Sequence, residues 1–377
     1  MSTSVEVTWP QIHGFRLERH HLLKRAPRRQ LVRVAGEIGG AQAQVMSSAE
    51  LQLAVRTTAP VSDVRDALWK DRTLVKTWLI RGTLHLLPSA DLPLYSAALR
   101  TITWTEAWFR WLKMTQRELD SLVEAMGDAL TDKPMTKEEL TARVGRGRPA
   151  HVREAIGGSW GSLLKPAARR GYLAFGPSRG TNVTLVNPRH WLPKWRDIDT
   201  DEAIVELARR YLRAYGPATK KDFTRWFGPS FHRGRGDPWP ALEKELVDVE
   251  VDGTRMYLLA ADARALTTRR PRGAVQLLPG FDPYLMGHMA RDHLFDKVHR
   301  WKVSRIAGWI SAVVLVDGRV EGTWTHRVSG DTLAIDVAPF APLGAATRKG
   351  VADRADELAR ALGLARAEVR LAKRQTR

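Results

Sequence analysis

The stretch Leu-Val-Lys-Thr-Trp-Leu-Ile-Arg-Gly-Thr-Leu-His-Leu-Leu, residues 74–87, decides how the first part of the chain folds. It is rich in residues that favour strands and is interrupted by Arg81-Gly82, which predicts a two-stranded hairpin. Two helical patterns precede it, one starting at residues 47–50 and one capped by Ser62-Asp63. Helices followed by a hairpin form a winged helix, so we expect a winged-helix unit here.

The same order of elements recurs twice downstream. The second copy begins at the capping box Thr136-Lys137-Glu138-Glu139, continues through helical segments over 152–156 and 160–170, and ends in a hairpin over 171–186. The third copy has helical patterns between residues 199 and 246, and a hairpin over 247–259 that turns at Asp252-Gly253. Three copies of one supersecondary unit predict a tandem array.

The composition changes after residue 272, where the chain becomes rich in strand formers. Strand-like segments cover 275–278, 310–316, 322–328 and 332–337, followed by a helix over 345–362 and a last strand over 367–371. The sequence therefore predicts an α+β fold of three tandem winged-helix units and a C-terminal β-rich domain. The expected domains are 1–115, which begins with a basic helix over 10–29, then 116–196, 197–268 and 269–377.

The charge indicates a polyanionic partner. Sixty Lys and Arg residues against 41 Asp and Glu give a net charge of +19 and a pI near 10.6. Arginine dominates, and its planar guanidinium suits bidentate contacts with phosphate. This composition favours nucleic-acid binding. A genome that favours arginine codons is the alternative explanation.

Several classes of protein are excluded by composition. The chain has no cysteine, which excludes disulfides, thiol nucleophiles, iron–sulfur clusters and cysteine-based zinc sites. The 11 histidines are scattered without a His-x-x-x-His pair, so we expect no metal site and no cofactor. No apolar run approaches the roughly 18 residues of a membrane span, and residues 1–9 lack an export signal. We expect a cytoplasmic protein.

The segment Gly39-Gly40-Ala41-Gln42-Ala43-Gln44 is the candidate active site. The glycine pair ends a helical pattern over 28–38 and allows an extended chain after it. Side chains two residues apart diverge on a helix but point to the same side of an extended segment, so Gln42 and Gln44 can share one target. Glutamine takes up no proton at neutral pH, so neither is an ordinary general base. Solvated loop glutamines are the alternative interpretation.

Four motifs in order give the chain a family resemblance. They are the glycine-preceded Gln-Ala-Gln, the Arg-Gly-Thr-Leu-His-Leu-Leu-Pro run at 81–88, the Leu-Leu-Pro-Gly-Phe-Asp-Pro-Tyr-Leu-Met-Gly run at 277–287, and Val-Asp-Gly-Arg-Val-x-Gly-Thr-Trp at 316–324. From about residue 30 to its end the chain resembles the AlkZ-type, or YcaQ-type, winged-helix DNA glycosylases. The resemblance implies a C-shaped body of three winged helices and a barrel-like C-terminal domain.

The resemblance also implies a reaction. It implies hydrolysis of the N-glycosidic bond of alkylated purines, including bulky N7 adducts and interstrand cross-links, and places Gln42 and Gln44 in the Gln-Φ-Gln branch associated with antibiotic self-resistance. An N7-alkylated guanine is already a cation and leaves without acid catalysis. What remains is to hold a water and to direct carbonyl dipoles at positive charge, which two glutamine amides can do. With no lysine amine at this position, we expect a monofunctional enzyme without a Schiff base.

Further residues are candidates for contact with double-stranded DNA that contains alkylated bases. Thr83 and His85 alternate on the first wing and could contact the lesion or a phosphate, or form a polar strand face. Asp282 reads better as a turn residue. The basic loop over 232–236 is either a groove probe or a plain loop. The basic candidates for the duplex are Arg16, Arg19, Lys24, Arg25, Arg28, Arg29 and Arg291.

Two alternatives remain at this point. Trp104, Trp108 and Trp111 share one helical face, which favours packing over base stacking. A basic array of winged helices is also typical of a non-catalytic DNA-binding regulator or a damage-sequestering protein, which binds without turnover. We expect a monomer in either case.

Overall fold

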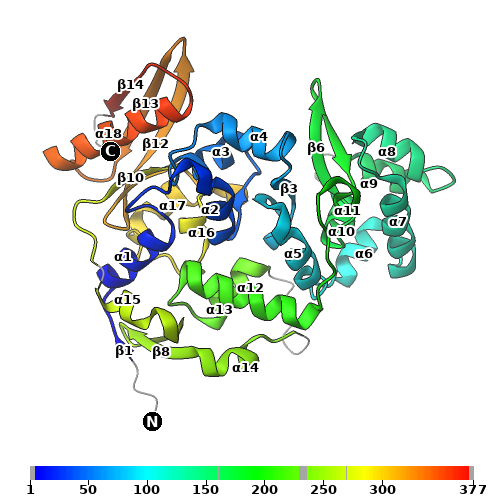
Figure 1. The fold of residues 1–377 in the computed structure, drawn as a ribbon, viewed down its shortest axis with the longest axis horizontal. Coiled ribbons are helices and arrows are strands. Elements are labelled where there is room, and N and C mark those ends of the chain that lie inside the picture. The colour runs from blue at the N-terminus through cyan, green and yellow to red at the C-terminus, as the bar shows by residue number, and fades with distance from the viewer. Residues whose placement is uncertain (1–4, 159–160, 229–235, 269, 373–377) are drawn as a thin grey trace. The chain divides into compact units, whose positions relative to one another are not determined.

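The structure, a computed structural model, describes residues 5–158, 161–228, 236–268 and 270–372. The chain forms two compact units (Figure 1). Unit 1 comprises Met1–Arg65, Arg209–Trp226 and Leu242–Arg377, and unit 2 comprises Asp66–Ala208 and Phe227–Ala241. Both units draw on segments that are distant in sequence, so they cut across the four consecutive domains expected above, and that division stays a prediction.

The third winged-helix hairpin belongs to unit 1. Strands β8 (Leu246–Val251) and β9 (Thr254–Leu259) pair antiparallel around Asp252 and Gly253, whose φ angles are 46° and 72°. Positive φ at both turn residues is what an Asp-Gly hairpin requires, and the predicted turn is confirmed. Strand β1 (Val5–Glu6) pairs parallel with β8, which the sequence did not predict because the partner lies more than two hundred residues away.

The basic N-terminal helix is shorter than expected. Helix α1 (Trp9–Arg19) ends at His20, and His21 takes a φ of 54°. The predicted basic helix, which was expected to run from residue 10 to a turn at Pro27, was therefore wrong beyond residue 19. The next elements are a 3-10 turn over Arg28–Gln30, α2 (Leu31–Glu37), β2 (Ala41–Gln42) and α3 (Met46–Ala54).

The C-terminal sheet of unit 1 confirms every strand predicted for it. Its order is β10-β11-β12-β13-β14, antiparallel except for the parallel pair β13 and β14. Helix α18 (Ala345–Ala361) is the crossover that a parallel pair needs, and it packs on the sheet through Val351 and Ala355 (Figure 1). The strands are β10 (Val275–Leu278), β11 (Val313–Val316), β12 (Arg319–Ser329), β13 (Thr332–Pro339) and β14 (Arg366–Leu371).

Short helices complete unit 1. Tyr211 and Phe223, from the helices that precede the third hairpin, are fully buried. The helices are α12 (Thr200–Tyr215), which begins in unit 2, α13 (Lys220–Phe227), whose last residue belongs to unit 2, α15 (Ala263–Thr268), α16 (Pro283–Met286) and α17 (Arg300–Val303), while α14 (Trp239–Leu242) lies in unit 2 except for Leu242.

Unit 2 holds the first hairpin and the second winged helix. Strands β3 (Leu74–Trp78) and β4 (Leu84–Pro88) pair antiparallel, and Arg81 and Gly82 turn the chain with φ angles of 57° and 65°. The Thr136 capping box is present in both directions, with Glu139 N donating to Thr136 Oγ1 over 3.2 Å. Leu119, Leu122 and Leu140 are buried in its core.

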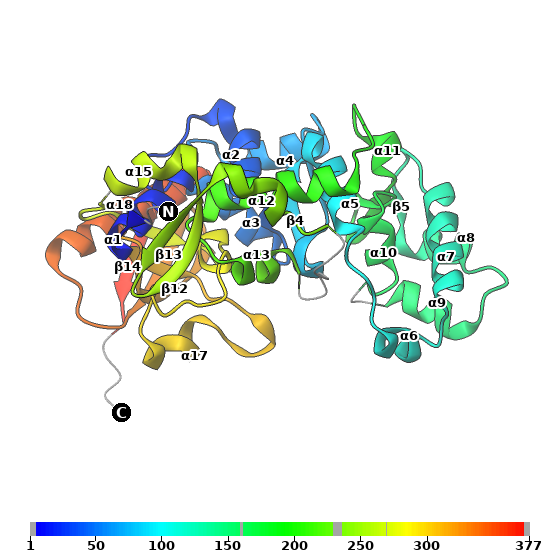
Figure 2. The same ribbon diagram turned by 90° about the horizontal axis from the view of Figure 1, so that it is seen from below.

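The helices of unit 2 surround that core (Figure 2). Helix α10 packs against α5, α7 and β3. The elements are α4 (Val61–Trp69), which begins in unit 1, α5 (Leu92–Leu99), α6 (Glu106–Leu112), α7 (Gln116–Ala129), β5 (Met135–Thr136), α8 (Lys137–Val144), α9 (Ala150–Gly157), α10 (Leu164–Arg169), β6 (Ala174–Arg179), β7 (Asn182–Val186) and α11 (Pro188–Trp191).

Of Trp104, Trp108 and Trp111, only the first two pack against the core of unit 2. Trp104 and Trp108 stack with ring centroids 4.3 Å apart and lie against the core. Trp111 is 66% exposed, because only one face of the short helix α6 meets the core. None of the described helices is both long and apolar enough to span a bilayer.

Candidate active site

The Gln-Ala-Gln segment leaves helical conformation at the glycine pair, as the sequence predicts. Gly39 and Gly40 take φ angles of 72° and 91°, and β2 follows in extended conformation. Two features favour glycine at position 39. Its φ angle is positive, and a Cβ there would lie 2.9 Å from the Trp226 ring. Tyr215 fixes the same bend by donating its hydroxyl hydrogen bond to the Ile38 carbonyl over 2.7 Å. The bend is therefore held by the core of unit 1.

The two glutamines have different surroundings. Gln42 is 4% exposed, whereas Gln44 lies at the surface. The Oε1 of Gln42 is buried, and no donor within the described residues reaches it. A buried acceptor without a partner costs about 1–3 kcal/mol, so such atoms are rare outside sites that take a ligand or water.

Gln52 fastens this segment to a distant part of the chain. Its Nε2 donates to the Gln42 carbonyl and to the Gly280 carbonyl, over 3.1 Å each. Gln52 is completely buried on α3. One amide thus joins the candidate segment to the motif over 277–287. This contact could not be predicted, because Gln52 lies in an ordinary helical pattern.

Arg16 was expected to contact DNA, but its side chain is buried. It is 2% exposed, and its guanidinium donates to the carbonyls of Tyr215 and Pro217 over 3.1 and 2.7 Å. These carbonyls surround the end of α12 and hold the side chain in the interior. Arg16 is therefore a buried structural residue, and it has no surface from which to reach a duplex.

The remaining basic residues of the N-terminal segment divide into paired and exposed groups. Arg19 pairs with Asp262, and Arg28 donates to Asp63 over 2.8 Å. Arg25 donates to the carbonyls of Ala54 and Thr57 and forms an ion pair with Glu357 over 3.3 Å. It therefore connects the N-terminal segment and the end of α3 to α18. Lys24 and Arg29 are exposed. These last two stay the best candidates of the six for phosphate contact.

Thr83 and His85 lie on the first hairpin, but His85 does not face solvent. It is 1% exposed, and burial, followed by the nearby Arg81 charge, lowers its pKa to about 3. Its ring is therefore neutral at pH 7, with Nδ1 donating to the Thr83 carbonyl over 2.9 Å and Nε2 accepting from Arg81 over 3.2 Å. Thr83 is half-buried and donates to the Ile80 carbonyl. His85 thus shapes the turn rather than offering a charge.

Asp282 is structural, as favoured from the sequence. Its carboxylate accepts two hydrogen bonds from Arg56, over 2.7 and 2.8 Å, and both side chains are completely buried. It also caps α16 by accepting from Tyr284 N. Arg291 is half-buried, donates to Ser304 Oγ over 3.0 Å, and has its pKa lowered to about 10 by burial. Its expected contact with DNA stays a prediction.

The structure contains an apolar turn over residues 304–310 that was not predicted from the sequence. Residues 304–310 fold back on themselves through Arg305 N, which donates to the Trp309 carbonyl over 2.8 Å. Ile306 at the apex is 94% exposed. The Ile310 carbonyl accepts from Phe281 N, directly after Gly280. The signal that could have found it is the apolar Ile-Ala-Gly-Trp in an otherwise basic stretch.

Four buried histidines line the interior of unit 1. Burial lowers the pKa of each, to about 3 for His13 and well below 6.5 for the other three, and neighbouring arginine charge adds to the effect. Two of the rings contact each other, with His13 Nε2 lying 3.3 Å from His293 Nδ1. No group of three His, Asp or Glu side chains among the described residues is arranged to hold a metal. The four are His13, His20, His288 and His293.

We expect these histidines to make unit 1 sensitive to acid. They are neutral when folded, whereas in the unfolded chain they bind protons below about pH 6.5. The unfolded state then holds more protons, so the free energy of unfolding falls as pH drops from 6.5 towards the folded pKa values, by up to about 1.4 kcal/mol per histidine for each pH unit. Urea unfolding at pH 7.5, 6.5 and 5.5 measures this. His13→Leu should flatten the profile and exposed His190→Leu should not; equal stability at all three pH values would contradict the expectation.

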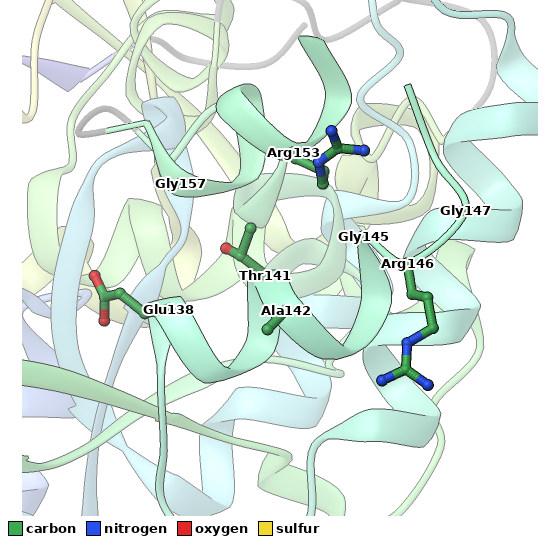
Figure 3. A pocket seen from close by; sticks show the side chains of 8 residues that line it. All are labelled: Glu138, Thr141, Ala142, Gly145, Arg146, Gly147, Arg153 and Gly157. Carbon is green, nitrogen blue, oxygen red and sulfur yellow. The ribbon is translucent and has the colours of Figure 1, made fainter. Parts of the chain in front are cut away.

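A surface depression with two arginines in its wall lies on unit 2. An open depression of about 620 Å³ is lined by Arg146 and Arg153 on one side and Glu138 on the other (Figure 3). It contains no buried acceptor or base, so it resembles a surface contact more than a reaction site. The basic loop over 232–236 falls, apart from Gly236, outside the described residues.

The extended strand β2 ends at Gln42, and Gln44 follows in a bend, so the expected convergence of the two side chains on one target stays a prediction. A basic chain of winged helices is typical of the class of DNA-processing winged-helix proteins. The profile of the DNA glycosylase AlkZ-like family matches residues 35–361. The interstrand DNA cross-link repair glycosylase of Streptomyces sahachiroi is 37% identical over 381 residues, which is 97% of this chain and all of that protein. The solved structure of Streptomyces sahachiroi DNA glycosylase AlkZ superposes with a TM-score of 0.87 at 34% identity, covering 99% of this chain and all of that one. The chain belongs to the AlkZ-like family and is a DNA glycosylase.

Proposed function

We propose that the protein hydrolyses the N-glycosidic bond of N7-alkylated purines in double-stranded DNA, including purines joined in interstrand cross-links. The observation that carries this proposal is the buried Oε1 of Gln42 at the end of strand β2, which has no hydrogen-bond donor among the residues that the structure describes. The name of the Streptomyces sahachiroi relative, a cross-link repair glycosylase, supports the cross-linked substrate.

The chemistry follows from the charge of the leaving base. N7 alkylation makes the purine cationic, so the C1′–N9 bond breaks with its electron pair moving to N9, which neutralises the base. The sugar develops oxocarbenium character, and a carbonyl oxygen directed at it stabilises the positive charge. Gln42 Oε1 supplies such a dipole and can accept a hydrogen bond from the attacking water, without taking up its proton. The water oxygen bonds to C1′, and its proton passes to solvent.

The same segment supports a monofunctional reaction. Residues 39–46 contain no lysine, so no side-chain amine of this segment can form a Schiff base with the abasic sugar. The product is then an intact strand with an abasic site. The protein acts as a monomer in this proposal, because both glutamines and the contacts that hold them come from one chain.

The apolar turn supports contact with distorted DNA. Ile306 is exposed and lies on the turn that ends at Ile310, whose carbonyl holds the backbone next to Gly280. Proteins that kink DNA insert apolar side chains of this kind between base steps. A wedge tied to the glutamine segment would bring the unstacked nucleotide to Gln42 without a deep base pocket.

The test is excision from duplexes that carry N7-methylguanine, a bulky N7 adduct or an N7-linked cross-link. We expect strand breaks that appear only after alkali, in excess of one product per protein. Breaks without alkali would contradict the monofunctional assignment. Failure on all three substrates would overturn the proposal and favour a sequestering protein or regulator, which protects DNA at one equivalent and makes no product.

A further inference from the structure

Arg169, on α10 of unit 2, is a cation whose hydrogen bonds are not satisfied by the protein. Its Nε and Nη1 are buried, and they find no acceptor among the described residues. The guanidinium lies over the Trp104 ring, 4.1 Å from its centroid. A stacked guanidinium gains from the ring but still leaves its in-plane N–H groups to be satisfied. Such donors are what a bidentate anion would occupy.

Lys165 adds a second positive charge one helical turn away. Burial and the charge of Arg169 both lower the pKa of Lys165, and burial lowers that of Arg169 to about 10. Like charges four residues apart on a helix repel each other, so this pair destabilises the empty protein. The neighbouring Arg170 forms ion pairs with Asp120 and Glu124. These carboxylates neutralise Arg170 but form no ion pair with Arg169 among the described residues.

The guanidinium opens into a cavity of about 240 Å³ between the end of α5, the start of α7 and α10. Thr103, Gln116 and Arg100 also line it. The Gln116 amide donates to Asp120 over 2.9 Å, and Arg100 lies 3.7 Å from Asp197. None of the described residues that line the cavity carries a carboxylate. The volume admits a phosphate group but is small for a nucleobase with its sugar. Shape and charge therefore select a tetrahedral oxyanion.

We propose that Arg169 binds one phosphodiester of the DNA backbone in this cavity, and that Lys165, one helical turn away and outside the lining, adds only long-range positive charge. The proposal rests on DNA being the ligand of the protein, and it is independent of which base is excised. Trp104 fixes the guanidinium plane, and the bound phosphate accepts from the part of the half-buried guanidinium that is not enclosed by protein. The bound phosphate then supplies the negative charge that neither cation receives from a described acidic side chain.

Binding of an undamaged duplex at several salt concentrations tests the proposal without any excision. Arg169→Met keeps the apolar stem and removes the charge. We expect it to weaken binding roughly fivefold to tenfold and to reduce the slope of log K against log salt by about 0.9, the value for one lost phosphate contact. Its melting temperature should equal or exceed that of the wild type, because a buried unpaired charge has been removed. Arg117→Met, an exposed arginine on α7, is the matched control and should change neither quantity.

Two further measurements keep the outcomes distinct. Arg169→Lys retains a charge and should retain the wild-type salt slope with weaker binding. A wild-type slope for Arg169→Met would overturn the proposal, and so would a fall in melting temperature in both variants with unchanged DNA binding, which would make Arg169 structural. Inorganic phosphate at constant ionic strength should raise the melting temperature of the wild type and not that of Arg169→Met. If it does so while the salt slopes of the two proteins agree, the cavity binds free phosphate instead of DNA.

Discussion

Replacing Gln42 by alanine is expected to lower the rate of N7-methylguanine excision about 100-fold, the usual loss when one preorganised electrostatic group is removed from an active site. The side chain is buried and its Oε1 has no partner among the described residues, so its removal deletes the dipole without breaking a protein hydrogen bond. Single-turnover excision measures the effect. Binding of undamaged duplex should be unchanged, because the loss concerns the reaction step.

Two other glutamine variants show whether the effect is specific to Gln42. Gln44→Ala should cost less, about tenfold, since Gln44 is exposed and water can replace part of its contribution. Gln30→Ala is the matched control, because Gln30 precedes α2 in the same unit and makes no capping hydrogen bond. A Gln42→Ala enzyme that excises at the wild-type rate would refute the role assigned to this residue.

Replacing Arg56 by methionine is expected to destabilise unit 1 by about 3–5 kcal/mol, because it leaves the Asp282 carboxylate buried and unpaired. The same change at Arg28, whose pair with Asp63 lies at the surface, should cost about 0–1 kcal/mol. Urea unfolding of the two variants measures the difference. The double variant Arg56→Met with Asp282→Leu should recover most of the loss, since no buried charge remains. Equal costs for Arg56→Met and Arg28→Met would show that the buried pair contributes no more than a surface pair.

Local patterns account for the parts of the fold that were predicted correctly. The hairpins at 74–88 and 246–259 and the C-terminal strands follow from alternation and turn residues, which act within a few positions of each other. Strand β1 and the grouping into two units depend on partners far along the chain, which no local pattern encodes. Likewise, nothing near Arg16 distinguishes it from a surface arginine, because the carbonyls that bury it belong to Tyr215 and Pro217.

The candidate site shows the same division. The glycine pair predicted the extended Gln42 segment, since positive φ is a local property. The burial of Gln42 and the amide bridge from Gln52 could not be predicted, because they arise only when the C-terminal half packs against α3. Residue types thus indicated the chemistry, and long-range packing decided which side chains are free to perform it.

The amide bridge from Gln52 has a consequence for the order in which the protein is made. Both glutamines are synthesised early, yet one of the two carbonyls that anchor Gln52 belongs to Gly280, which leaves the ribosome much later. A growing chain therefore carries the reactive segment for most of its synthesis without the contact that fixes it. The geometry of the candidate segment is in this way completed only after residue 280 has been synthesised.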